Sequence, residues 1–279
     1  MQILFSNSLS LLLCSLVLIS ASCSRPQLPL EERLDNLRIL ALITEPPEAD
    51  PSAQVEVTPV ISDLFGKGRV LTFSAELCRL YDRNYLGSCT AIAKDQAVTG
   101  LKPPSFTGKV DPFHVVLPSA EIVFAFQSAQ DQYNGVRFQV NYQLKSTDGS
   151  TLKAHKKIYV SNKPVAEKNH NPVIQSIDRE GVALIIFPVQ TGQLTPHFGQ
   201  VSSESYTVMS KEGKLSSLVE TLEVSWMASV GELGSFNTME SQSNSFTRSN
   251  MPSGLAQSAV LAAVVRDERG GMGVFILTP

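Results

Sequence analysis

The chain has 279 residues, of which 43% are hydrophobic and 18% charged, and its formal net charge is −3. This length suits one large domain or two ordinary ones. The near balance of charge, without a basic stripe, excludes a surface built for nucleic acid.

The first residues have the layout of a signal peptide. Leu11–Ile19 is a compact apolar run, the small residues Ser20–Ser22 follow it, and the first charged side chain is Arg25. This run is shorter than the roughly 20 apolar residues that span a bilayer. The pattern predicts a signal peptide over residues 1–22 and an exported chain, with an uncleaved membrane anchor as the alternative.

Cys23 stands directly after this segment. The string Ile19–Cys23 (ISASC) resembles the bacterial lipobox, which implies that the Cys23 thiol carries a lipid and anchors the chain to a membrane. Ser24 takes the place where an aspartate would imply retention in the inner membrane, so the resemblance implies the outer membrane. The alternative is ordinary cleavage, which would leave Cys23 as a free thiol in an oxidising compartment. Residues 23–36 are polar, contain proline and are predicted to form a tether.

A first all-β domain is predicted over residues 37–162. Val136–Leu144 alternates apolar and polar side chains with a period of two, as expected of a strand with one buried face. Leu71–Leu77 and Val55–Thr58 show the same alternation. Several short strands with regular turn signals predict an immunoglobulin-like β-sandwich.

Two dipeptides punctuate the strands of this domain. Asn134-Gly135 precedes the strand at Val136, and Asp148-Gly149 follows it. Both tolerate the positive φ angles that hairpin turns need. Leu152–Val160 is therefore the expected partner strand of a long hairpin.

The two remaining cysteines, Cys78 and Cys89, are predicted to form a disulfide. Cys14 leaves with the signal peptide and Cys23 takes the lipid, and one leftover pair in an exported chain is typical of a single bridge. The loop that it closes is short, so we expect about 3 kcal/mol of stabilisation. A metal site is the weaker alternative, because the spacing lacks a Cys-x-x-Cys motif and a nearby histidine. We predict no metal and no cofactor.

Three aromatic residues lie in or near the predicted disulfide loop. Tyr81, Tyr85 and Phe106 could form a ligand surface, since loops at the end of a rigid sandwich often carry recognition. The alternative is that these rings pack the loop against the sandwich.

A polar linker over residues 163–172 separates a second predicted sandwich over residues 173–279. Leu222–Ala228 alternates like a strand, and its Trp226 is expected in the core. Ala259–Val265 is apolar on both faces, as expected of a central strand that is covered on both sides.

Three stretches resemble one family. Leu37–Pro51, Leu222–Glu232 and Val264–Gly271 are similar to segments of predicted lipoproteins from myxobacteria and related Gram-negative predators. The resemblance implies an immunoglobulin-like domain followed by a second immunoglobulin-like or PKD-like domain. It implies no activity.

The motifs of common enzymes are missing from the sequence. There is no P-loop, Gly-x-Ser-x-Gly elbow, His-Glu-x-x-His motif or dinucleotide fingerprint, and the histidines are isolated. We therefore predict no catalytic residue. Asp267 and Glu268 could contribute to a calcium site, although a polar turn is the favoured interpretation.

These features predict a non-enzymatic envelope lipoprotein that acts as an interaction or scaffolding module. Its expected partners are the membrane, through the N-terminal lipid, and an envelope protein or glycan. The alternatives are a glycan- or peptidoglycan-binding accessory or adhesin and, less favoured, a hydrolase whose catalytic residues assemble only in the fold.

Overall fold

The computed structural model describes residues 31–66, 68–80, 86–101, 106–188, 190–199, 203–248 and 259–279. Residues Glu32–Pro279 form one compact unit. Most of its described residues are in strands, and the helical elements among them are α2 (Ala120–Val123), α3 (Ala129–Asn134) and the 3-10 helix η1 (Val165–Glu167). Among the described residues, no helix is long and apolar enough to cross a membrane.

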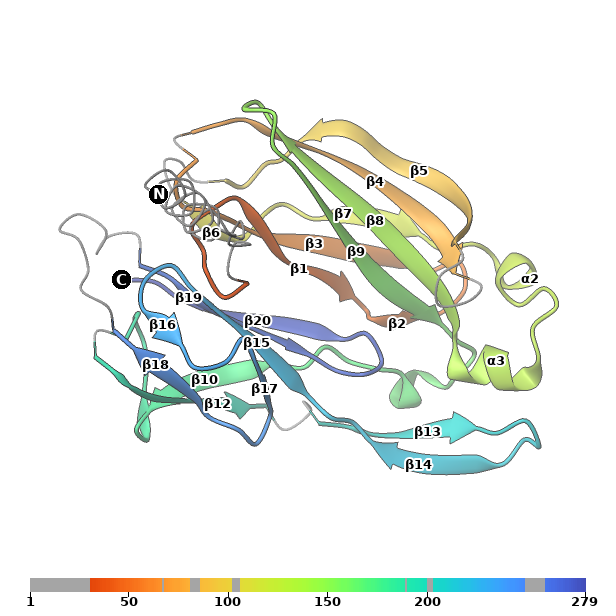
Figure 1. Cartoon of the computed structure of the whole chain (residues 1–279). Coiled ribbons are helices and arrows are strands. Elements are labelled where there is room, and N and C mark those ends of the chain that lie inside the picture. The colour runs from red at the N-terminus through yellow and green to blue at the C-terminus, as the bar shows by residue number, and fades with distance from the viewer. Residues whose placement is uncertain are drawn as a thin grey trace, which may run out of the picture. The chain divides into compact units, whose positions relative to one another are not determined.

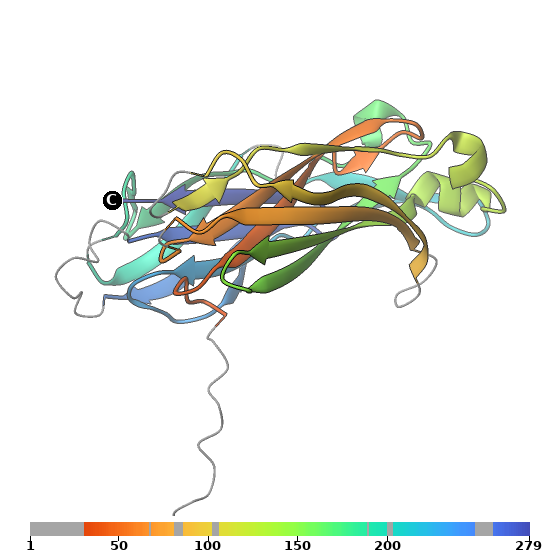
Figure 2. The same ribbon diagram turned by 90° about the horizontal axis from the view of Figure 1, so that it is seen from above.

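The first half of the unit is a sandwich of two sheets (Figure 1). The five-stranded sheet has the order β2 (Glu48–Ala49), β9 (Thr151–Val160), β8 (Val136–Ser146), β4 (Leu71–Leu80) and β5 (Leu86–Ala97). The facing sheet has the order β1 (Arg38–Glu45), β3 (Gln54–Asp63) and β6 (Phe106–Lys109), and β7 (Phe113–Val116) also pairs with β3. The two helices α2 and α3 lie at one end of this sandwich (Figure 2).

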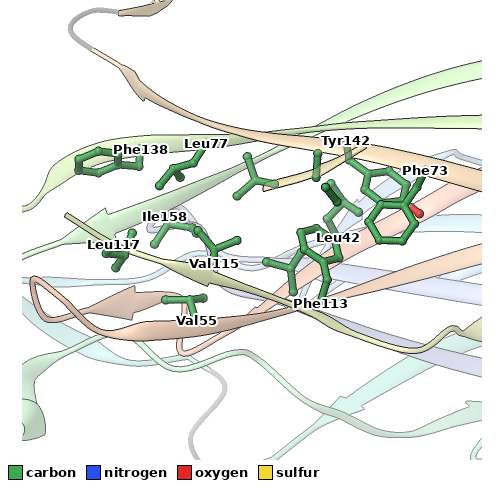
Figure 3. Close-up of a cluster of buried hydrophobic side chains, with 14 of the residues drawn as sticks. Leu42, Val55, Phe73, Leu77, Phe113, Val115, Leu117, Phe138, Tyr142 and Ile158 are labelled. Carbon is green, nitrogen blue, oxygen red and sulfur yellow. The ribbon is translucent and has the colours of Figure 1, made fainter. Parts of the chain in front are cut away.

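The core of the first sandwich follows from the predicted alternation. The apolar side chains of Val136–Leu144 and Leu71–Leu77 point inward and are buried, which confirms both predicted strands. Figure 3 shows these side chains between the two sheets. Three aromatic rings pack there, with 5.2 Å between the centroids of Phe73 and Phe113 and 5.3 Å between those of Phe73 and Tyr142.

The second half of the unit is another sandwich. One sheet has the order β17 (Asn237–Met239), β15 (Glu223–Ala228), β19 (Leu261–Arg266) and β20 (Met272–Leu277). The other has the order β11 (Val182–Ala183), β10 (Ile174–Arg179), β12 (Gly192–Phe198), β18 (Asn244–Thr247) and β16 (Glu232–Leu233). Trp226 is fully buried between them, as predicted, and its Nε1 donates a hydrogen bond to Thr238 Oγ1 at 2.8 Å.

A third apolar cluster lies between the two sandwiches. Along β19, Leu261, Ala263 and Val265 pack in the second core. The alternate residues Ala262 and Val264 pack with side chains of β1 and β3, among them Val60. The unit is therefore a stack of four sheets with apolar contacts at all three junctions, and the prediction that this strand is covered on both faces is confirmed.

The end of the predicted tether takes part in the same junction. Ala228 donates a backbone hydrogen bond to Glu32 at 2.7 Å and accepts one from Leu34 at 3.0 Å, so the chain runs beside β15 as a short parallel bridge. Leu34 is fully buried in the apolar cluster between the sandwiches.

The predicted fold class, all-β with two β-sandwiches in tandem, is confirmed. The hairpin turn at Asp148-Gly149 is also confirmed, with Gly149 at φ 90°. A hairpin turn at Asn134-Gly135 is wrong, because Gly135 instead ends helix α3 with φ 97°. The helix begins at a capping box, in which Ser128 and Asp131 satisfy each other's backbone N–H groups.

Candidate interaction surfaces

A two-stranded hairpin extends from the second sandwich toward the end of the first. Its strands are β13 (Ser205–Met209) and β14 (Leu215–Val219), and they form a sheet of their own. The hairpin turns at Gly213, which has φ 75°, and closes with a hydrogen bond from the Ser210 N–H to the Lys214 carbonyl at 2.8 Å. Figures 1 and 2 both place the hairpin (cyan) near α3.

The outer edge of β13 is occupied by side chains of the first sandwich. Asn134 Nδ2 donates to the Met209 carbonyl at 2.9 Å, and Asn134 Oδ1 accepts from the Met209 N–H at 2.8 Å. This amide thus pairs with the strand edge as a neighbouring peptide group would. Tyr133 Oη lies 2.6 Å from Thr207 Oγ1 and 2.5 Å from Glu167 Oε2. Burial, followed by the hydrogen bond to Glu167, raises the pKa of Tyr133.

The outer edge of β14, by contrast, pairs with no described strand. In an antiparallel pair, residues that bond across the ladder alternate with residues whose peptide groups point outward. The pairs Ser210–Lys214 and Glu204–Glu220 bond across this hairpin. The bonded residues of this strand therefore have even numbers. The odd-numbered residues of β14 point their N–H and C=O groups away from β13.

The side chains of β14 are also exposed. Leu215, Leu218 and Val219 keep 57%, 44% and 66% of their surface accessible, and Ser216 and Ser217 are exposed between them. The strand carries no charge and no proline. An exposed apolar edge of this kind is a template for pairing with another strand.

The edge strand β5 of the first sandwich has bulges and charged side chains that β14 lacks. Its pairing with β4 is broken by three register shifts, and Asp95 takes a positive φ of 45°. Lys94 and Asp95 are exposed on it, and Asp95 Oδ1 pairs with Lys145 Nζ at 2.8 Å. Bulges and charges are the ordinary means of blunting an edge. The β14 edge has neither.

A second surface is a polar groove of about 420 Å³ on the outer face of β4, β8 and β9. The strand register sets Glu76 opposite Asn141, and Asn141 opposite His155. Two strand spacings, about 10 Å, therefore separate the Glu76 backbone from that of His155. The residues that line the groove are Ser74, Glu76, Asn141, Tyr142, Gln143, Lys153, Ala154 and His155.

The groove gathers the residue types of a hydrolase without assembling them. Ser74 Oγ donates to Asp95 Oδ1 at 3.3 Å, and within the described chain no hydrogen bond joins Ser74, Glu76 and His155. Nucleophilic catalysis needs the hydroxyl and its base within hydrogen-bond reach. The groove thus offers separate hydrogen-bonding groups.

A cluster of buried charge joins the two sandwiches. Arg269 Nε lies 2.5 Å from Glu220 Oε1, Arg269 Nη2 lies 2.7 Å from Glu204 Oε2, and Arg269 Nη1 lies 3.8 Å from Glu48 Oε2. The guanidinium also stacks on the Tyr206 ring at 4.6 Å. Burial raises the pKa of Glu220, although the Arg269 hydrogen bond opposes this. Because Arg269 bonds directly to Glu220 and Glu204 and lies within ion-pair distance of Glu48, the cluster is suited to holding the sandwiches together.

The predicted site residues fall in different places. Cys78 and Cys89 form the predicted disulfide, with an S–S distance of 2.07 Å. Cys23, Tyr81 and Tyr85 lie outside the described residues. Phe106 begins β6, on the sheet opposite the disulfide, where it is half-buried against the first core.

Candidate metal ligands are engaged within the protein. In the described chain, one group of three potential ligand atoms lies within 4.8 Å, that of Glu76, Cys78 and Cys89, and its two sulfurs are bonded to each other. Asp267 accepts hydrogen bonds from the Gly271 N–H at 2.7 Å and from Asn169 Nδ2 at 3.1 Å. Glu268 accepts one from Thr221 Oγ1. Asp267 and Glu268 thus have the contacts of a polar turn.

Comparison with known proteins assigns the chain to no family. No family model matches it, and neither does any curated protein. Among solved structures, a match is the crystal structure of the periplasmic chaperone SfaE, at 13% sequence identity and a TM-score of 0.26. The match covers 85% of this chain and 98% of that one.

Proposed function

We propose that the chain is an exported, non-enzymatic protein-interaction module whose contact element is the free edge of β14. The observation that carries this proposal is an exposed strand of uncharged residues with outward peptide groups at Leu215, Ser217 and Val219. An extended segment of a partner would add to such an edge through main-chain hydrogen bonds, while its side chains cover the exposed leucines and valine.

The proposal also places the chain in the cell envelope. The Cys78–Cys89 disulfide supports an oxidising compartment, in agreement with the signal-peptide pattern. The lipobox-like string at Ile19–Cys23 supports a lipid anchor, and Ser24 supports the outer membrane.

Ser217→Pro tests the contact element. The Ser217 N–H points away from β13, so proline removes an outward donor and leaves the cross-hairpin hydrogen bonds in place. Envelope proteins retained by the wild-type chain should be lost with Ser217→Pro and kept with Ser217→Thr, at unchanged circular dichroism. Equal retention by all three chains would show that β14 is not the contact element.

Cys23→Ala tests the anchor separately. The wild-type chain should carry a lipid-sized mass and stay with membranes, and Cys23→Ala should lose both. Cys14→Ala is the matched control, because this residue precedes the proposed cleavage site and leaves the mature mass unchanged. An unlipidated wild-type chain would overturn the anchor and leave the β14 proposal standing.

A glycan-binding accessory is the second candidate, and the polar groove favours it. Gln143, Lys153 and His155 line the groove without a side-chain hydrogen bond to another described residue, so their donors and acceptors are free for ligand hydroxyl groups. Retention on immobilised peptidoglycan should fall in a Gln143→Ala, His155→Ala variant and persist in Lys214→Ala, whose side chain lies on the hairpin. Equal retention of the two variants would rule out the groove.

A further inference from the structure

We infer that β14 pairs with β14 of a second copy of this chain, antiparallel and about a two-fold axis at Ser217. The inference rests on the proposed role of the β14 edge and names its occupant. The β14 edge combines outward peptide groups, exposed apolar side chains and freedom from bulges.

The backbone of β14 is complementary to itself in this register. The two-fold axis sets Leu215 opposite Val219 of the second copy and Ser217 opposite Ser217 of the second copy. All of these residues present their peptide groups outward, so each pair can exchange both hydrogen bonds. Shifting the register by one residue would set outward groups against inward ones and break the ladder.

The side chains are complementary in size. On one face of the new sheet, Leu218 lies opposite Ser216 of the second copy, so a large side chain meets a small one. On the other face, Leu215 lies opposite Val219 of the second copy, which forms an apolar pair of the kind that stabilises sheets. The three exposed apolar residues of the strand are covered together.

The charge of Lys214 disfavours the parallel direction. Parallel pairing in register would set Lys214 beside Lys214 of the second copy, and these like charges would repel each other. In the two-fold antiparallel register the two lysines lie at opposite ends of the paired strands. Glu220 stands opposite Lys214 of the second copy, but its carboxylate is buried and stays bound to Arg269 of its own chain.

Pairing of one short strand buries less surface than the roughly 1,200–2,000 Å² of a standard stable interface. We therefore expect a weak dimer in dilute solution. Confinement of anchored copies to one membrane would raise their effective concentration and favour the pair. In this arrangement the lipid concentrates the chains at the membrane and the hairpin joins them, so the chain is a self-assembling envelope protein.

The test is disulfide trapping in a full chain that carries Cys14→Ser and Cys23→Ser. A hydrogen-bonded antiparallel pair has a Cα–Cα distance of about 5.5 Å, within the range that a disulfide spans. Mild oxidation should therefore link Ser217→Cys into a dimer, with a yield that falls on dilution. Ser216→Cys is the matched control, because this exposed serine faces Leu218 of the second copy and should stay monomeric.

Sedimentation of the wild-type chain gives a second measurement that needs no new cysteine. A monomer–dimer equilibrium that Leu218→Lys abolishes supports the inference. A wild-type chain that stays monomeric at every soluble concentration overturns it, as does equal linking at positions 216 and 217. If partner retention is still lost in Ser217→Pro while the chain is monomeric, a foreign strand occupies the edge and the proposed function stands. If retention is also unaffected, both fail.

Discussion

Lys156 Nζ, from the core-facing side of β9, donates a hydrogen bond to the Gly270 carbonyl in the turn between β19 and β20. Lys156 is 4% exposed, in line with Ile158 and Val160 of the first core. Burial lowers its pKa to about 8, although the nearby Asp267 carboxylate acts in the other direction. One turn of the second sandwich thus covers an ammonium group at the edge of the first.

This burial predicts a pH-dependent stability. The unfolded lysine keeps its proton up to a pKa of 10.5, whereas the folded one loses it near pH 8. Between these values the unfolded state binds more protons, so the free energy of unfolding should rise with pH, by at most about 3 kcal/mol. Lys156→Met should be as stable as the wild type at pH 7 or more so, and should lack this rise. Urea unfolding from pH 7.5 to 10 measures both.

Above pH 10, tyrosine ionisation also changes the stability of the protein. Burial raises the pKa of Tyr142, so above pH 10 the unfolded tyrosine loses its proton before the folded one and stability falls. Tyr142 is present in both chains and gives them the same fall. Parallel pH profiles for wild type and Lys156→Met between pH 8 and 10 would contradict the assignment of the rise to Lys156.

Arg269→Met should destabilise the protein by about 3–5 kcal/mol, because it leaves the buried carboxylate of Glu220 without its cation. Glu220 and Glu204 keep 1% and 17% of their side-chain surface accessible and share this guanidinium. Burial already raises the pKa of Glu220, and loss of the Arg269 hydrogen bond would raise it further, so the variant should gain stability as the pH falls toward 5. Thermal melts at pH 5 and pH 7.5 check the sign. Lys214→Ala, on the exposed hairpin, should change neither melt.

Leu34→Ala tests whether the segment before β1 contributes to the apolar cluster between the two sandwiches. Leu34 is fully buried there, so its truncation should cost about 2–5 kcal/mol. Leu218→Ala is the control, since Leu218 is 44% exposed and its loss should stay within about 0.5 kcal/mol. Chemical denaturation gives both values. A Leu34→Ala chain as stable as the control would mean that the entering segment is not part of the folded unit.

Sequence patterns predicted those strands whose two faces differ or whose burial is complete. Val136–Leu144 was correctly predicted as a strand, because burial of one face imposes a period of two. Ala259–Val265 was also correctly predicted, because burial of both faces leaves a run without polar residues. The burial of Leu34 was not predicted, because Leu30, Leu34 and Leu37 have the i, i+4, i+7 spacing of a short helix within the tether, and the structure has no helix over residues 31–37. Leu34 is buried in a cluster with residues that are distant in the sequence, among them Val60 and Ala262.

The exposed edge of β14 was harder to predict from the sequence. Leu215–Val219 (LSSLV) is exposed on both faces, so no burial pattern marks it as a strand. The turn residues Lys211–Lys214 around Gly213 were the available signal. Helix α3, which sets Asn134 against the hairpin, was not predicted either, although Ser128 and Asp131 have the spacing of a capping box in the sequence. That the β14 edge is free depends on where the other strands lie, which local patterns do not encode.

Asn134→Ala should loosen the hairpin without unfolding either core. It removes both hydrogen bonds that Met209 makes with the first sandwich, at a cost of about 1–3 kcal/mol. Amide exchange should accelerate at Met209 and along β13 while the cores stay protected. Gln132→Ala, in the same helix, is the control and should leave the hairpin unchanged. Because a loosened strand must be ordered again before it pairs, Asn134→Ala should also reduce dimer trapping through Ser217→Cys. Unchanged exchange at Met209 would show that the amide does not hold the hairpin in place.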